Sequence, residues 1–241
     1  MPLKYQGETF GIVDVYHSEK LDFRKIDAGP LIALGSCLYG AVKKEVIIKS
    51  LQERDDIIEA FARTIEAADR YTGGHVDRVC KYALIIGQAL GFDKGELRLL
   101  KRAALLHDIG KIGIPYSVLN KEGPLTADEW DIIKRHPVIA QEILRPVTDA
   151  SFTRALEGIV YNHERIDGKG YPFGIKGEDI PLPARIIAIV DTYDALTSDR
   201  PYRKGMDSEK ALEILRENCG TQLDATLAEL FIEKMRETGS H

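Results

Sequence analysis

The sequence predicts a mainly α-helical protein, in which a short N-terminal β segment and a long helix precede a larger helical domain. Beyond Gly73, apolar residues recur at spacings of three and four in segments that glycine and proline separate. Before Ile26, one short stretch has the β-branched and aromatic composition of a strand. With 241 residues, the chain is long enough for one full domain and a smaller piece.

The β segment covers Thr9 to His17, and it predicts one strand of a small sheet. One or two strands are not stable by themselves. We therefore interpret residues 1–25 as the end of a larger domain, or as a segment that pairs with another chain.

Residues 26–66 are expected to form a long helix, because the helical pattern of apolar residues runs from Ile26 to Asp69. A helix of this length between two modules usually links or dimerises them, and we expect a homodimer through it. The alternative, a helix packed on its own domain, fits the pattern equally well.

Residues 67–237 are expected to form the main domain. Its predicted helices are Gly74–Leu90, Lys94–Leu106, Thr126–Lys134, Pro137–Leu144, Ser151–Tyr161, Pro183–Ser198, Ser208–Asn218 and Asp224–Arg236. Thr126 with Glu129 predicts a capping box, and Asp207 or Ser208 is expected to cap the penultimate helix. The glycine-rich segment from Glu164 to Pro183 has no helical period and is expected to be a functional loop. Residues 238–241 resemble the remnant of an expression tag and are set aside.

The composition of the chain indicates which kinds of binding partner and which cellular compartment to expect. The net charge of −5 argues against a DNA-, RNA- or membrane-surface-binding protein, which would carry a basic excess. The longest uncharged run, Ala28–Val42, is shorter than a membrane span requires. Three cysteines, far apart and odd in number, predict reduced thiols and a cytoplasmic location.

The adjacent pair His107 and Asp108 carries the first chemical signal. It follows the apolar stretch Ala103–Leu106, where an unpaired carboxylate would be costly to bury and so needs a partner or a metal. Neighbouring residues of a helix diverge by about 100°. The pair can therefore address two sides of one centre, and if the helix continues, Lys111 lies on the same face as His107.

Asp191 and Asp194 form a second acidic pair, three residues apart after another apolar run. A single histidine on a helix is more often a hydrogen-bonded core or surface residue than a ligand, and two aspartates could simply pair with Arg185 or Arg200. Three further histidines in polar or helix-terminal positions make a metal site the better interpretation: His75, His136 and His163. Histidine and aspartate together suit Fe, Mn or Zn, and a metal-bound water is a ready nucleophile for phosphodiesters.

These residues lie in a series of motifs that resembles the HD-GYP family of the HD phosphohydrolase superfamily. The motifs are Tyr71–His75, His107–Lys111, His136-Pro137, His163-Glu164 with Asp167–Pro172, Asp191–Ser198 and Arg200–Arg203. The resemblance runs in order from Glu66 to Phe231. It implies an all-helical bundle that hydrolyses cyclic di-GMP to pGpG and GMP, with some members preferring cyclic GMP-AMP. Residues 1–25 also resemble the closing portion of a GAF sensor domain.

The HD-GYP resemblance assigns roles by position. The implied ligands of two divalent ions (Fe or Mn, with Zn as an alternative) are His75, His107, Asp108, His136, His163 and Asp191. Asp108 would bridge the ions and act in catalysis with Lys111, which contacts phosphate, and with Asp194 as a candidate general acid. The substrate would be held by Lys111, Arg200, Arg203 and Tyr171, since arginine pairs well with phosphate. The loop around Tyr171 implies a GGDEF-domain protein as a partner.

Two positions depart from the family pattern. Asn162 stands where the family has a histidine, and an amide is a much poorer ligand for these metals than imidazole. Tyr71 stands where three-metal members carry a glutamate, which favours two ions at most. The leading hypothesis is a cyclic di-GMP phosphodiesterase. Its rival is a catalytically weak or silent HD-GYP domain that acts as a receptor or interaction module, and a more distant alternative is a hydrolase of another phosphoester.

Overall fold

The computed structural model describes residues 2–5, 8–12, 55–67, 69, 74–147, 150–199 and 204–239. Contacts divide the chain into two units, Met1–Asp56 and Ile57–His241. Most of the expected long helix and residues 240–241 lie outside the described residues, so the dimer, the GAF resemblance and the tag remnant stay predictions.

In the first unit, β1 (Pro2–Tyr5) pairs antiparallel with β2 (Glu8–Ile12), and the register shifts between Leu3 and Lys4. The described strand β2 overlaps the N-terminal half of the expected strand. Residues 13–17 lie outside the described part of the chain.

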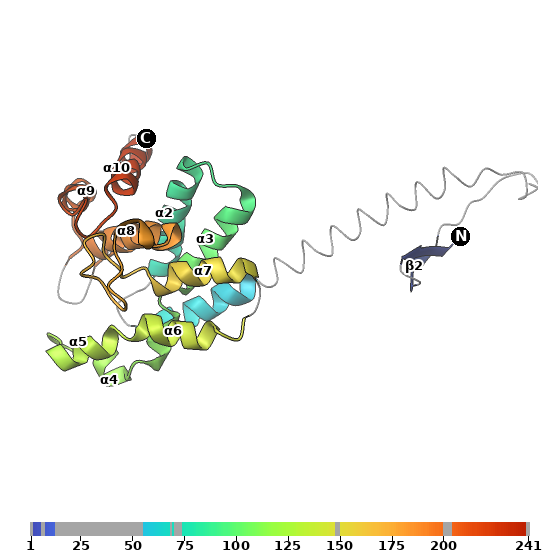
Figure 1. Ribbon diagram of the computed structural model, residues 1–241, viewed down its shortest axis with the longest axis horizontal. Helices are drawn as coiled ribbons and strands as arrows, with labels where there is room; N and C mark the ends of the chain where they lie inside the picture. The colour runs from blue at the N-terminus through green and yellow to red at the C-terminus, as the bar shows by residue number, and fades with distance from the viewer. Residues whose placement is uncertain are drawn as a thin grey trace, which may run out of the picture. The chain divides into compact units, whose positions relative to one another are not determined.

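The second unit is helical, as the sequence predicted (Figure 1). Its elements from residue 75 onward are α2 (His75–Ala89), α3 (Lys94–Leu106), the 3₁₀ helix η2 (Ile109–Gly113), α4 (Tyr116–Leu119), α5 (Ala127–Ile133), α6 (His136–Leu144), α7 (Ala150–Val160), the 3₁₀ helix η3 (Gly177–Asp179), α8 (Leu182–Thr197), α9 (Ser208–Glu217) and α10 (Ala225–Gly239). All the expected helices beyond Gly73 are present. The short elements η2, α4 and η3 were not predicted.

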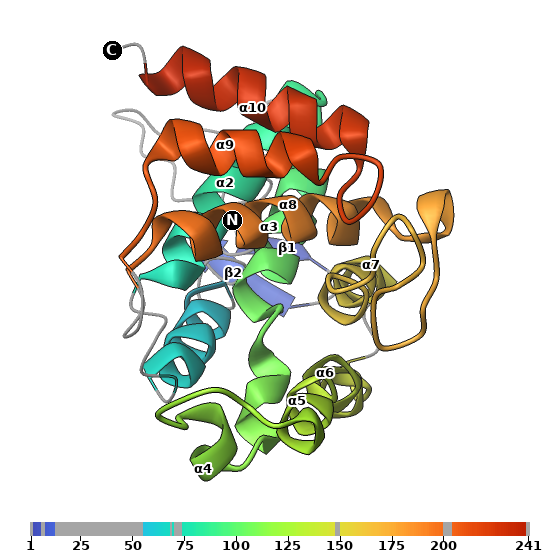
Figure 2. The ribbon, with the colours of Figure 1, turned by 90° about the vertical axis from the view of Figure 1, so that its left-hand side faces the viewer.

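Helix α8 forms the centre of this unit. Its residues Ile186, Ile187, Ile189 and Val190 are fully buried, as expected for a helix that is apolar on nearly every side. It packs against α2, α7 and α9. Helices α9 and α10 lie together at one end of the unit, and α4, α5 and α6 lie at the other (Figures 1 and 2).

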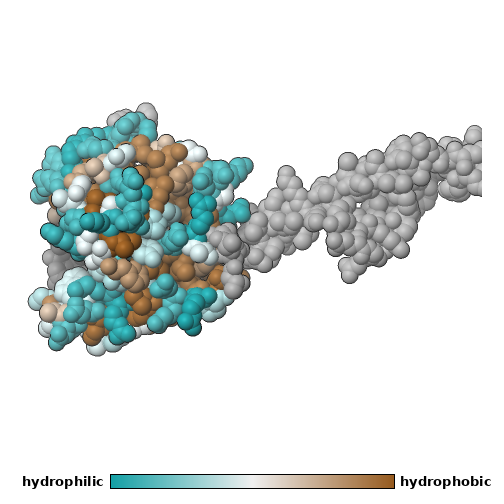
Figure 3. Space-filling view, in the orientation of Figure 1, coloured by the Kyte–Doolittle hydropathy of each residue, from teal (hydrophilic) through white to brown (hydrophobic). Residues whose placement is uncertain are grey.

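Helical residues 57–67 belong to the second unit, and Ala62 and Ile65 are buried in it. The end of the expected long helix therefore packs on its own domain, and both alternatives stay predictions for residues 26–54, which lie outside the described residues. On the opposite side, Ile57 and Phe61 are 57% and 62% exposed. Apolar and hydrophilic side chains alternate over the face of the helical unit in Figure 3.

Helix ends follow the predicted capping chemistry. Thr126 and Glu129 form the expected capping box at α5, and the Asp207 carboxylate accepts from the backbone N–H of Glu209 at α9. Asp93 and Glu96 form a further capping box at α3 that was not predicted. Within the described part of the chain, no helix is long and apolar enough to cross a bilayer.

Candidate metal centre

His75 and His107 face each other at the junction of α2 and α3. Their Nε2 atoms lie 3.2 Å apart. The Nδ1 of His107 donates to the carbonyl oxygen of Ala104 at 2.7 Å, and the Nδ1 of His75 donates to the Asp194 carboxylate at 2.7 Å. In the neutral imidazoles the proton therefore sits on Nδ1, so that two Nε2 lone pairs point at each other. Such a pair requires a proton or a metal ion between the rings. Burial lowers the pKa of His75, but its bond to Asp194 and the nearby Asp191 outweigh burial and raise it, so a protonated His75 would donate to His107. A transition-metal ion can take the place of that proton.

Asp108 places a carboxylate beside this pair. Its Oδ2 atom lies 3.5 Å from the Nε2 of His107 and 3.9 Å from the Nε2 of His75. Its other oxygen, Oδ1, lies 3.7 Å from the Nε2 of His136. The two carboxylate oxygens thus face different histidine groups, which is the arrangement that a carboxylate shared by two ions requires.

The condition under which Lys111 would lie on the same helix face as His107 is not met, because the helix ends at Leu106 as predicted. Asp108 precedes the 3₁₀ helix η2. This turn brings the Nζ of Lys111 within 2.7 Å of Asp108 Oδ2 and 3.2 Å of Asp69 Oδ2. Lys111 therefore reaches the centre, but through the turn rather than along one helix face.

His136 and His163 form a second facing pair. His136 is the first residue of α6, and His163 follows the end of α7. Their Nε2 atoms lie 3.1 Å apart, and the Nδ1 of His136 donates to the carbonyl oxygen of Ile133 at 2.8 Å. Gly110 allows α6 to approach, because a Cβ at this position would lie 1.8 Å from the His136 carbonyl oxygen.

Asp191 completes the first group from α8. Its Oδ1 lies 3.6 Å from the Nε2 of His75 and 4.0 Å from that of His107. The structure thus brings together all six residues that the resemblance assigned as ligands. Donor atoms within 4.8 Å of one another make two groups that could hold an ion, which are His75, His107 and Asp108, and Asp108, His136 and His163.

The buried charges stabilise one another. Burial alone would raise the pKa of Asp108, but Lys111 and His107 hold it well below its usual range. Burial disfavours the ammonium of Lys111, but Asp108 and Asp69 outweigh burial and raise its pKa. Burial and the neighbouring His136 lower the pKa of His163 to about 3, so that this ring is a neutral imidazole, the form that binds metal.

Asp194 lies behind His75. Its carboxylate is 1% exposed and accepts hydrogen bonds from His75, Arg78 and Ser198. Arg78 was not predicted as part of the site. Its position three residues after His75, on the same face of α2, is the signal that would have found it.

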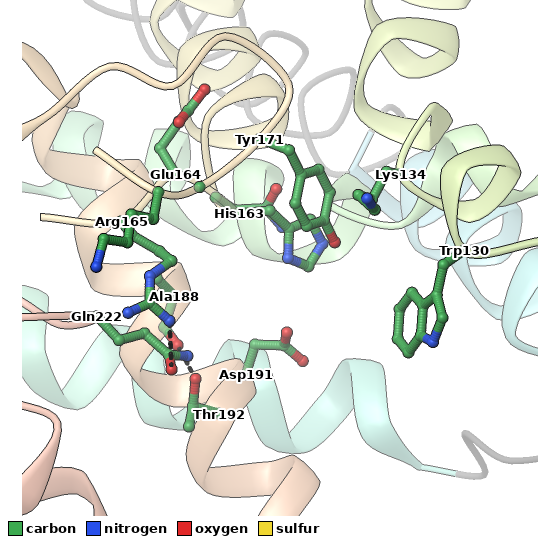
Figure 4. A pocket seen from close by; sticks show the side chains of 13 residues that line it. Trp130, Lys134, His163, Glu164, Arg165, Tyr171, Ala188, Asp191, Thr192 and Gln222 are labelled. Carbon is green, nitrogen blue, oxygen red and sulfur yellow. Dashed lines mark hydrogen bonds between the residues drawn. The ribbon is translucent and has the colours of Figure 1, made fainter. Parts of the chain in front are cut away.

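Two cavities meet at the centre. A cavity of about 620 Å³ is lined by Lys111, Lys121 and Pro124, and another of about 380 Å³ by Lys134, Arg165 and Gln222. Both are lined by Trp130, His163, Tyr171 and Asp191, and Figure 4 shows these four side chains around the smaller cavity. Trp130, 49% exposed and the chain's single tryptophan, is a further residue that sequence reasoning missed.

Asn162 is 2% exposed, and neither polar atom of its amide has a hydrogen-bond partner among the described residues. It lines the smaller cavity together with His163. Tyr71, Arg200 and Arg203 lie outside the described residues, so their expected roles stay predictions.

The arrangement matches a known family. A family model of the HD domain matches residues 59–227, which is more than half of the chain. The chain belongs to the HD-domain family. This HD domain is 39% identical over 168 residues to 3′3′-cGAMP-specific phosphodiesterase 3 of Vibrio cholerae, covering 70% of the present chain and 36% of that protein. It is 40% identical over 178 residues to the cyclic di-GMP phosphodiesterase response regulator RpfG of Xanthomonas campestris, covering 73% and 47% of the two chains.

Solved structures show the same fold. A cyclic GMP-AMP-specific phosphodiesterase of V. cholerae superposes with a TM-score of 0.57 at 22% identity, covering 76% of this chain and 49% of that one. An HD-GYP-type protein of Bdellovibrio bacteriovorus superposes with a TM-score of 0.55 at 21% identity, covering 67% and 51%. The present chain covers less than half of the length of each of the two curated relatives named above.

Proposed function

We propose that this chain is a metal-dependent phosphodiesterase of cyclic dinucleotides, with cyclic di-GMP as the first substrate to test. The observation that carries the proposal is the Asp108 carboxylate, whose two oxygens face two separate pairs of histidines. Relatives named cyclic di-GMP and 3′3′-cGAMP phosphodiesterases support the substrate class, and they leave both cyclic dinucleotides as candidates.

The residues fit two divalent ions, Fe or Mn with Zn as an alternative. His75, His107, Asp191 and one oxygen of Asp108 would hold the first, and His136, His163 and the other oxygen of Asp108 the second. The bound ions would neutralise phosphate charge and lower the pKa of a water that attacks phosphorus.

The protein residues bind and orient the substrate. Lys111, on the edge of the larger cavity, supplies a cation for a phosphate oxygen in the transition state. Tyr171 lines both cavities and would border the substrate, and Arg200 and Arg203 would pair with phosphate. Asp194 was a candidate general acid. Its burial and its bond to His75 instead favour a role in orienting that ligand.

The test is turnover by the loaded protein. Protein purified without oxygen and loaded with Mn²⁺ or Fe²⁺ should convert cyclic di-GMP to pGpG or GMP, followed by chromatography, with cyclic GMP-AMP as a parallel substrate. Asp108→Asn should abolish turnover of both. An absence of hydrolysis at every metal loading, with nucleotide binding retained, would contradict the enzyme proposal.

One observation favours a second candidate, a silent domain that binds cyclic di-GMP or a partner protein. Asn162 offers an amide where an imidazole would complete the second ion site. Binding of cyclic di-GMP without hydrolysis, together with gain of hydrolysis in Asn162→His, would favour this candidate.

The remaining expectations belong to the whole protein. A GGDEF-domain protein would contact the loop around Tyr171, whose neighbour Phe173 is 52% exposed. A homodimer would form through residues 26–66, and the protein would be cytoplasmic. Sedimentation at several concentrations tests the dimer, and a monomeric mass at high concentration would contradict it.

A further inference from the structure

Three of the four histidines at the centre are oriented by a hydrogen bond at Nδ1. His75 bonds Asp194, His107 bonds the carbonyl oxygen of Ala104, and His136 bonds that of Ile133. A bond of this kind fixes both the tautomer and the direction of Nε2, and it raises the affinity of the ring for a metal.

His163 is oriented differently. The one hydrogen bond of its ring among the described residues joins its Nε2 to the Nε2 of His136. Its ring instead lies flat against the ring of Tyr171, with centroids 4.8 Å apart and planes 14° apart (Figure 4). The ring of His136 meets the ring of His163 edge-on, with centroids 4.8 Å apart. Aromatic stacking therefore sets the plane of His163.

This difference changes what each histidine pair needs. The Nε2 atoms of His75 and His107 face each other, and with both Nδ1 atoms donating elsewhere this pair requires an added proton or a metal ion. The ring of His163 can carry its proton on Nε2 and donate it to His136, because no acceptor for a proton on Nδ1 is found in the described part of the chain. The Nε2 atoms of His136 and His163 can thus be hydrogen-bonded to each other without a metal ion. An ion that binds here must displace this hydrogen bond.

The position of Tyr171 is itself fixed by its loop. Its backbone N–H donates to the carbonyl oxygen of His163 at 3.2 Å. A Cβ on Gly170 would lie 2.6 Å from the same oxygen and 2.5 Å from the Cα of Glu164, so only glycine permits this approach. The buried Glu164 carboxylate accepts from the backbone N–H groups of Phe173 and Gly174.

We propose that the two halves of the centre fill in order and that Tyr171 sets the affinity of the second half. The half formed by His75, His107 and Asp191 binds the first ion. The half formed by His136 and His163 binds the second and weaker one, and Tyr171 is a positioning residue that acts through the plane of His163. This inference rests on the proposed function for the existence of the two-ion site.

Titration of metal-free protein with Mn²⁺, followed by calorimetry and by the electron paramagnetic resonance signal of coupled Mn²⁺ pairs, tests it. The parent should bind two ions in two resolved steps. Tyr171→Leu, which removes the ring, should bind the first ion as the parent does and weaken the second about tenfold or more. Tyr171→Phe, which keeps the stacked ring, should restore the second step.

Tyr161→Leu is the matched control. Tyr161 packs against Phe173 of the same loop but lines neither cavity, so its loss should leave both steps unchanged. Equal binding steps in the parent, an unchanged second step in Tyr171→Leu, or a second step lost equally in Tyr171→Phe would overturn the inference. Failure of the phosphodiesterase proposal can be distinguished from failure of this inference. It would appear as two bound ions, with the expected binding steps in the Tyr171 variants, but no hydrolysis. A parent that binds no Mn²⁺ overturns both.

Discussion

His75 donates from Nδ1 to the Asp194 carboxylate at 2.7 Å, and the opposite ring nitrogen points at His107. Asp194 in turn accepts from Arg78, which joins α2 to α8 behind the ligand. Through Asp194, helix α8 fixes the orientation of His75, the first residue of α2. The orientation of His75, the first of the proposed ligands in the chain, is thus decided by a residue 119 positions away.

Asp194→Asn tests this relationship. An amide is a weaker acceptor than a carboxylate and does not stabilise the His75 orientation as well, so affinity for the first Mn²⁺ should fall about 10- to 100-fold. Calorimetry of Mn²⁺ binding measures the change. Asp128→Asn, an exposed aspartate on α5, is the control and should bind as the parent does. Parent-like affinity in Asp194→Asn would remove the positioning role.

Lys111→Met tests the cation beside the Asp108 carboxylate, which is proposed to serve both ions. Removal of a charge that stabilises the transition state should lower kcat about 10²- to 10³-fold. Mn²⁺ affinity should not fall, because the lysine ammonium repels metal ions and its ion pair occupies an oxygen of Asp108. Both effects disappear in the variant. The exposed Lys81→Met on α2 serves as comparison. A loss of Mn²⁺ affinity in Lys111→Met would instead indicate a structural role.

Asn162→Leu tests the buried amide. An unsatisfied buried amide destabilises the fold, so an apolar side chain of similar size should raise the unfolding free energy by about 1–3 kcal/mol. Urea unfolding in the presence of a chelator measures it. If Asn162→Leu is less stable than the parent under these conditions, the amide has a partner that stabilises the fold.

Asn162→His tests the same position for metal. An added imidazole should strengthen the second Mn²⁺ step, since imidazole is a better ligand than an amide. Calorimetry compares the two proteins at equal pH. Unchanged binding would show that the side chain at 162 does not reach the second ion.

Gly170→Ala tests the close approach of the Tyr171 loop to the chain at His163. The added Cβ meets backbone atoms that cannot rotate away, so the loop must move, at a cost of about 1–3 kcal/mol in unfolding free energy. Gly95→Ala, where the nearest heavy atom is a side-chain oxygen, should cost little. Equal effects of the two substitutions in urea unfolding would show that the approach at Gly170 is not rigid.

The sequence predicted the helices beyond Gly73 because their apolar period and capping residues are local signals. It also predicted which residues gather at the centre, since His75, His107, His136, His163 and Asp191 lie in recognisable motifs. It predicted where α3 ends but not the 3₁₀ turn η2 that follows, because this turn depends on the approach of α6 to Gly110.

Other features of the site depend on contacts between distant segments. Arg78 bonds Asp194 116 positions away, and Trp130 becomes part of the site only when α5 packs beside the loop that holds Tyr171. The different ways in which the four histidines are oriented also cannot be predicted from the sequence. Three of them depend on the oxygen that their Nδ1 bonds, and His163 depends on the ring that stacks on it.

The central claim is that Asp108 serves two ions and that both are needed for hydrolysis. The direct measurement is the rate of cyclic di-GMP hydrolysis as Mn²⁺ is added stepwise to metal-free protein, with bound Mn²⁺ counted in the same samples. The account predicts little activity at one bound ion per chain and a steep rise as the second binds. Full activity with one ion, or none with two, would contradict it.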